Sequence, residues 1–175
     1  MQNLQPPSIP DPDSGWPWPE FGAALDSALL RSGFDYWRRL IRPGEALPRF
    51  GDFEPRGIAR LLANVILLEV RHNPIDFRYR VIGQDVLNHL FGNYTGQWIS
   101  AIPRQAEPGA LIDNLRRAVE ERRPLVPDIP YIGPKRHFKE IKVLFLPFAG
   151  EDGAVCRLLV FIDIIMLPGR LKPLI

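Results

Sequence analysis

Side chains that carry catalysis or bind metals are sparse in this chain. It has one cysteine, Cys156, and three histidines, His72, His89 and His137. The sequence has no phosphate-binding loop and no Gly-x-Ser-x-Gly nucleophile elbow, and its His, Cys and Asp residues form no triad pattern. No pair of histidines or carboxylates has the spacing of a metal site. We therefore expect a protein that is not an enzyme and that binds no metal.

Charged residues within predicted strands allow two interpretations. Arg78 and Arg80 share one face of a strand, and Glu69 lies on the neighbouring predicted strand. They either form cross-strand ion pairs on the outer sheet face or present an arginine to an acidic ligand or partner. Asp163 interrupts an apolar strand and needs a partner if it is buried, for which we expect an arginine. Asp52 is expected to cap the short helix that follows it.

Length and composition indicate one domain with one core, since the chain has 175 residues of which 46% are hydrophobic. The formal net charge of +2 does not indicate a nucleic-acid partner. The longest apolar run, 155–167, contains two charges and is shorter than the roughly 20 residues that span a membrane. The N-terminus lacks the pattern of a secretory signal. We expect a cytoplasmic protein without a membrane or nucleic-acid partner.

The hydrophobic pattern predicts the order of the elements. An amphipathic helix over 21–42 either covers the domain or forms a dimer seam. A strand hairpin, several helical segments and three further strands follow, with the last and most apolar strand in the centre of the sheet. This order predicts an α+β domain with helices on one sheet face. The predicted strands are 64–71, 77–82, 125–132 (an edge strand), 138–148 and 155–166, and the longest later helix is 108–123.

The N-terminal segment is rich in proline. Six of the 19 prolines lie within residues 1–20, where they favour an extended arm. Trp16 and Trp18 in this arm either dock onto the domain or a second copy of it, or belong to a partner-binding peptide. The predicted organisation is an arm at 1–20, a helix with its connection at 21–46, the main domain at 47–168 and a tail at 169–175.

A set of short motifs occurs in a characteristic order. The motifs are Tyr36-Trp37, Leu47-Pro48, Asp52-Phe-Glu-Pro55, Phe77-Arg-Tyr-Arg80 with Gly83, and Thr95-Gly96. With these motifs, residues 34–163 resemble the PAS domain family, and most closely its bacterial single-domain subfamily. The resemblance implies a five-stranded antiparallel sheet with a helical cradle over one face. It also implies a small-molecule site in that cradle, or pairing with other PAS domains through the outer sheet face and a flanking helix.

Two cofactors known in PAS domains lack their signatures here. A flavin photosensor would carry a reactive cysteine in the stretch that corresponds to 91–96, which has none. A haem sensor would carry an axial histidine on the long helix, and 108–123 has none. Cys156 is expected to be a small core residue. The cofactor, if there is one, is unknown from the sequence.

The expected function is a non-enzymatic sensory or signalling module. It binds a small molecule in the cradle and relays this through contacts with a second copy or a signalling protein. The alternative is a constitutive dimerisation or adaptor domain with a filled core. The candidate pocket residues are Tyr79, Val81, Leu87, Phe91, Trp98, Leu115, Phe145 and Phe161, and the candidate dimer or partner contacts are Leu29, Tyr36, Trp37 and Leu40.

Overall fold

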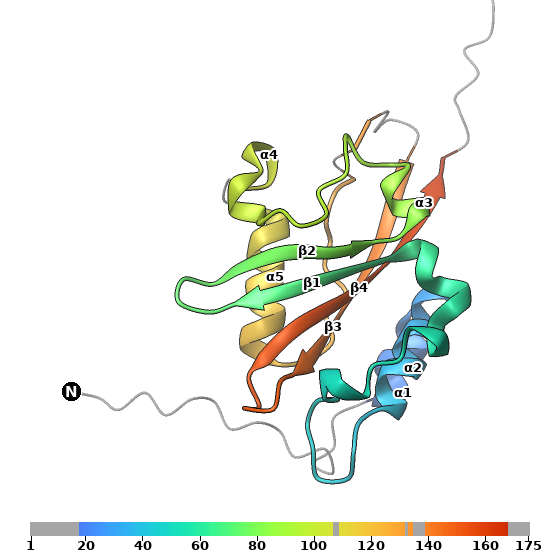
Figure 1. Cartoon of the computed structure of the whole chain (residues 1–175). Helices are drawn as coiled ribbons and strands as arrows, with labels where there is room; N and C mark the ends of the chain where they lie inside the picture. The colour runs from blue at the N-terminus through green and yellow to red at the C-terminus, as the bar shows by residue number, and fades with distance from the viewer. Residues whose placement is uncertain (1–17, 107–108, 132, 135–138, 168–175) are drawn as a thin grey trace, which may run out of the picture.

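A computed structural model describes residues 18–106, 109–131, 133–134 and 139–167 of the chain (Figure 1). Most of the predicted arm, including Trp16, and the tail at 169–175 lie outside the described residues. Trp18 is described, and its ring packs 5.6 Å from that of Trp37. Of the alternatives for Trp18, the structure therefore shows docking onto the domain.

Four strands form one antiparallel sheet in the order β2–β1–β4–β3. β1 pairs with β2 and β3 pairs with β4 as two hairpins, and the β1–β4 pairing joins them. The α+β class, the two hairpins and the central place of the most apolar strand are confirmed. The strands are β1 (Val65–Arg71), β2 (Asp76–Ile82), β3 (Lys139–Ala149) and β4 (Val155–Met166).

The predicted fifth strand at 125–132 does not form in the described part of the chain. Leu125 makes a single antiparallel bridge to Phe145 of β3. Pro127 and Pro130 follow it, and proline supplies no N–H for a strand ladder. Two further bridges join the sheet edges: Arg49 to Ala149 of β3, and Trp98 to Arg78 of β2. Short bridged segments therefore line both edge strands.

β2 contains a bulge that interrupts its alternation. Leu67 pairs with Val81 and Leu68 with Tyr79, so Arg80 is an extra residue in β2. Because side chains alternate between faces, one extra residue reverses the face of those that follow. Val81 is 47% exposed, whereas Tyr79 is buried.

One face of the sheet is covered by the helices that follow β2. The longest of these, α5, packs against β3 with its stripe of Ile112, Leu115, Ala118 and Val119, as the 3.6-residue periodicity predicts. Its C-cap, Arg122, has a left-handed backbone (φ 52°). The helices on this face are α3 (Gln84–Leu87), η3 (Ile99–Ala101), α4 (Pro103–Ala106) and α5 (Ala110–Glu121).

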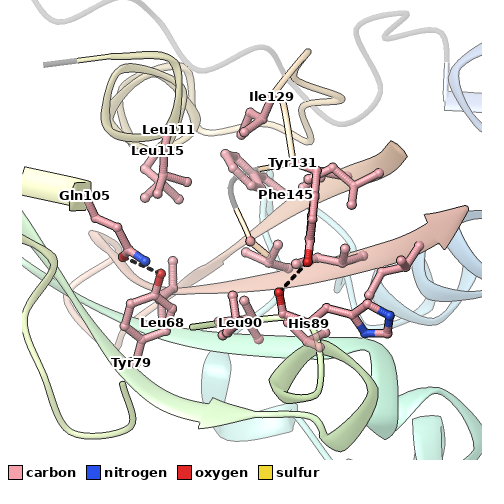
Figure 2. A pocket seen from close by; sticks show the side chains of 18 of the residues that line it. Leu68, Tyr79, His89, Leu90, Gln105, Leu111, Leu115, Ile129, Tyr131 and Phe145 are labelled. Carbon is pink, nitrogen blue, oxygen red and sulfur yellow. Dashed lines mark hydrogen bonds between the residues drawn. The ribbon is translucent and has the colours of Figure 1, made fainter. Parts of the chain in front are cut away.

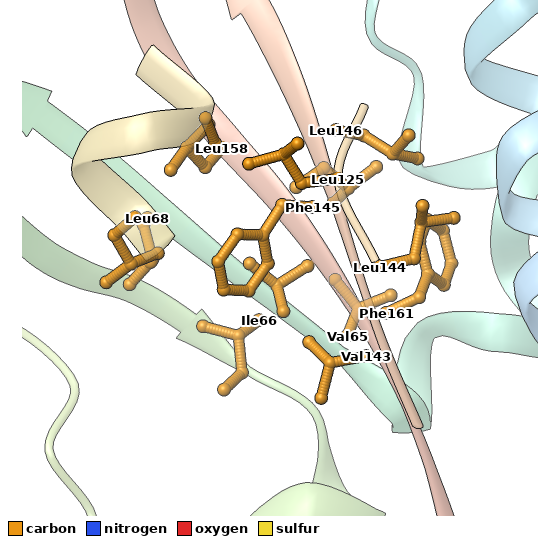
Figure 3. Packing of buried hydrophobic residues seen from close by; sticks show 14 of the residues in the cluster. Val65, Ile66, Leu68, Leu125, Val143, Leu144, Phe145, Leu146, Leu158 and Phe161 are labelled. Carbon is orange, nitrogen blue, oxygen red and sulfur yellow. The ribbon is translucent and has the colours of Figure 1, made fainter. Parts of the chain in front are cut away.

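The opposite face is covered by the N-terminal helices, so the prediction of helices on one face only is wrong (Figure 1). The reason is that β3 and β4 are apolar on both faces, as expected of strands that are covered on both sides of the sheet. Figure 3 shows Leu144, Leu146 and Phe161 on the side of the N-terminal helices, and Phe145 on the side of α5. The elements on the outer face are α1 (Trp18–Ala24), α2 (Ala28–Arg39), η1 (Phe50–Asp52) and η2 (Pro55–Asn64).

The single helix predicted over 21–42 is in fact two helices. The break lies just before Ser27, whose side chain caps α2 by accepting a hydrogen bond from the Leu30 amide at 3.2 Å. A serine at the N-cap favours the start of a new helix at this point. Its side chain accepts a hydrogen bond from a first-turn amide that has no partner within the helix. Asp52 does not cap η2 as predicted. It pairs with Arg42 at 2.6 Å, and η2 begins with Pro55, which suits a first turn.

The four residues predicted as dimer or partner contacts all pack against the core of their own protomer. Trp37 is fully buried and its Nε1 donates to the Pro147 carbonyl at 2.8 Å. The Tyr36 hydroxyl is buried against Glu54, donating to its carbonyl and accepting from its amide, both at 2.9 Å. Leu29 and Leu40 are half-buried and pack against the same core. The apolar stripe of this helix therefore faces its own sheet and covers the domain, while dimer or partner contacts through the half-buried Leu29 and Leu40 stay a prediction.

Candidate functional site

A cavity lies between the inner sheet face and the helices that cover it (Figure 2). Its volume is about 90 Å³, less than the ~150 Å³ of a dry apolar cavity that holds benzene. Alternate residues of β1, β3 and β4 form its floor, and α5 forms its roof. The lining residues are Ile66, Leu68, Tyr79, Val86, His89, Leu90, Ile99, Gln105, Leu111, Leu115, Ile129, Pro130, Tyr131, Gly133, Ile141, Val143, Phe145, Val160, Ile162 and Ile164.

One end of the cavity carries a buried polar pair. The Tyr79 hydroxyl donates to the Gln105 side-chain carbonyl at 2.8 Å. Burial raises the pKa of Tyr79 far above its ordinary range, so the phenol is neutral at any physiological pH. This end is therefore uncharged but polar.

The other end is closed by Tyr131. Its hydroxyl donates to the His89 carbonyl at 2.7 Å, with the Pro134 carbonyl at 3.0 Å, and accepts from Lys139 Nζ at 3.3 Å. Lys139 also lies 5.2 Å from the centre of the Tyr131 ring, which allows a cation–π contact. These contacts occupy the hydroxyl and fix the ring in place.

A second, more polar hollow adjoins the cavity at the Tyr131 end. The two share Ile129, Pro130, Tyr131 and Ile141 as lining residues. Asp128, Lys139 and Glu140 complete the second hollow. The apolar cavity therefore meets a charged vestibule at Tyr131.

Of the predicted pocket residues, the structure brings Tyr79, Leu115 and Phe145 to the cavity. It places the others elsewhere, for local reasons. Val81 is turned outward by the bulge at Arg80, and Phe91 is 55% exposed beyond the end of α3. Leu87 is half-buried on α3 but does not reach the lining.

The remaining two predicted residues pack elsewhere in the fold. The Trp98 ring lies beneath two guanidinium groups, with Arg71 at 4.3 Å and Arg78 at 5.0 Å from its centre. Phe161 is fully buried on the outer face, where its ring lies against Gly33 of α2. Neither contributes to the cavity.

Sequence reasoning missed several lining residues. Ile66, Leu68 and Val143 follow from strand alternation once the strand pairing is known. Gln105 and Tyr131 do not, because they come from short connecting segments whose path depends on the packed fold. For the Tyr131 segment, the sequence contains one local indication of its structure: Pro127 and Pro130 prevent it from pairing as a regular strand.

The charged residues of the outer face form ion pairs, so the cross-strand interpretation is confirmed. Glu69 contacts Arg78 at 2.7 Å and Arg80 at 3.6 Å. Burial acts to raise the pKa of Glu69, but the hydrogen bond and charge of Arg78 outweigh it, and the pKa is lowered. Asp163 does not pair with an arginine as predicted. It accepts a hydrogen bond from the Ser27 hydroxyl at 2.7 Å.

The described residues bring no three His, Cys, Asp or Glu side chains together as a metal site. Cys156 is only half-buried rather than a core residue, and burial raises the pKa of its thiol, which disfavours the reactive thiolate. Of the helices in the described ranges, none combines the length and the apolar character needed to span a bilayer.

Comparison with known proteins identifies the family of the chain. No curated protein matches the chain. A similar solved structure is that of a sensory box sensor histidine kinase from Vibrio cholerae, with 15% identity and a TM-score of 0.42 over 63% of this chain and 90% of that one. The family model described as PAS domain matches residues 25–162, which include α2, α5 and all of the cavity floor except Ile164. The chain therefore belongs to the PAS domain family.

Proposed function

We propose that this PAS domain is a non-enzymatic, cytoplasmic sensory module that binds a small molecule in the cavity beneath α5. The observation that supports this most is the cavity itself, which is apolar, lies in the core and meets a charged vestibule. Concave apolar sites with a few placed polar groups are typical of small-molecule binding. The described lining residues include no nucleophile with an activating base, so the proposed role is binding without chemistry.

The relay of binding would run through the strands that form the cavity floor. Ile162 and Ile164 line the cavity, and Asp163 between them holds the Ser27 cap of α2. A ligand that spreads the isoleucines would therefore act on the start of α2. Such a shift requires the ligand to bind one arrangement of α2 more tightly than the other. A second copy or a signalling protein that contacts α2 would then bind more tightly or more weakly as α2 shifts.

The alternative is a constitutive dimerisation or adaptor domain. The small volume of the cavity, about 90 Å³, favours this alternative. With so little free space, the side chains nearly fill the core without any ligand. The two functions differ in one measurable property. Only the sensor gains stability when a small molecule is bound.

The test is native mass spectrometry of freshly purified protein beside a denatured spectrum. A mass excess that is lost on denaturation supports the sensor. The variant Leu115→Phe fills the cavity and should abolish the excess, while Val81→Phe adds similar bulk at an exposed position and should retain it. A bare native mass, together with no thermal stabilisation by a library of small apolar molecules, would remove the sensor and leave the adaptor.

A further inference from the structure

The buried end of the cavity carries a polar group whose hydrogen bonds are only partly formed. Gln105 is 6% exposed, and its side-chain carbonyl accepts from Tyr79. Its amide nitrogen makes no hydrogen bond to another residue of the described ranges. Figure 2 shows the side chain reaching from α4 to the Tyr79 hydroxyl, with the amide group at the end of the cavity below Leu115. Because Gln105 lines the cavity, its amide can donate to an acceptor that enters.

The rest of this end excludes charged ligands. Gln105 shares the lining with Tyr79, Leu111 and Leu115, and the described lining contains no lysine or arginine. Its histidine, His89, lies at the Tyr131 end (Figure 2). Lys139 belongs to the vestibule at the opposite end, where it donates to the Tyr131 hydroxyl. A carboxylate placed beside Gln105 would lose its hydration without gaining a counter-charge.

We infer that the cavity selects a small, neutral, apolar molecule with one hydrogen-bond acceptor, such as a ketone or aldehyde oxygen, which binds the Gln105 amide. This inference rests on the proposed ligand-binding function and names the class of ligand for the same site. The hydrocarbon part of the ligand lies among Leu68, Leu115 and Phe145. The ligand is smaller than benzene, because the cavity volume of about 90 Å³ is less than the ~150 Å³ of a cavity that holds benzene.

Three probes of similar size test the acceptor. Acetone carries the carbonyl, isobutene replaces that oxygen with a CH₂ group, and acetate carries a charge. Binding is followed by methyl NMR titration, with contacts from each probe to Leu115 and Phe145 to show that it lies in the cavity. The ketone should bind roughly three- to tenfold more tightly than the hydrocarbon, the worth of one net hydrogen bond. Acetate should give no cavity contacts.

Two variants assign the preference to one side chain. Gln105→Met keeps the length of the side chain and removes the amide, so the ketone and the hydrocarbon should bind equally. The matched control Gln97→Met changes an exposed glutamine and should keep the wild-type preference. If Gln105→Met does not fold by circular dichroism, the wild-type comparison of the probes still decides the question.

The outcomes separate the two proposals. Equal binding of ketone and hydrocarbon inside the wild-type cavity would overturn the acceptor inference and leave the ligand-binding function intact. A preference that survives in Gln105→Met would also overturn it. If no probe enters the cavity, the acceptor inference fails. The native mass spectrometry described above then tests the ligand-binding function separately.

Discussion

Gly33 offers a sharp test of the two-sided sheet. It lies within α2, where alanine is ordinarily better than glycine by about 1 kcal/mol. A Cβ at this position would lie 2.7 Å from two atoms of the Phe161 ring and 2.9 Å from a third. Phe161 is fully buried, so the ring has little room to move. Overpacking of this kind costs about 1–3 kcal/mol. Since three ring atoms lie within 3.0 Å, we expect the upper part of this range, about 2–3 kcal/mol. After the gain in helix propensity, Gly33→Ala should therefore destabilise the protein by about 1–2 kcal/mol.

The assay is urea unfolding, with two comparison variants. Gly92→Ala adds a Cβ with no atom within 4 Å and should change the free energy of unfolding by less than about 1 kcal/mol. Phe161→Leu removes the opposing ring, so the double variant should be more stable than the sum of the single changes predicts. A Gly33→Ala protein as stable as the wild type, or more so, would refute the packing of α2 on the outer sheet face.

Two further predictions follow from contacts already described. Trp37→Phe removes the hydrogen bond to the buried Pro147 carbonyl and should cost about 1–3 kcal/mol in urea unfolding, while the mass by light scattering stays unchanged. A lower mass in the Trp37→Phe variant would instead support the hypothesis that this helix forms a dimer interface. The lowered pKa of Glu69 contributes stability that is present above its unfolded pKa, near 4.5, and lost as pH falls through the folded pKa. Glu69→Gln should therefore lose less stability than the wild type between about pH 5 and pH 3, measured by thermal unfolding, and an equal loss would contradict this.

Much of the sheet could be predicted because its signals are local. The apolar run of β4 and the alternation in β3 each define a strand, and the turns between paired strands are short. The second layer of helices could also have been predicted. Leu144 and Leu146 alternate with Val143 and Phe145, so β3 is apolar on both faces and needs cover on both. The amphipathic helix with Tyr36 and Trp37 was available to provide that cover.

The cavity was harder to predict, for two physical reasons. First, the bulge at Arg80 changes the face of Val81, and a bulge of this kind leaves no clear mark in a strand of alternating residues. Second, the polar ends depend on Gln105 and Tyr131, which are brought in by irregular segments. The face on which Phe161 lies was also hard to predict. Its strand, β4, is buried on both faces of the sheet, and an aromatic residue fits either face.

The bridged edges of the sheet bear on how copies of this domain could associate. An open edge strand presents unpaired N–H and C=O groups and invites pairing with another chain, which leads to sheet extension or aggregation. Here the Trp98 segment accompanies β2, while the Leu125 and Arg49 segments accompany β3. Strand addition at either edge would first have to displace one of these segments. Assembly of this domain is therefore expected to use side chains on helices and loops rather than a continuous intermolecular sheet.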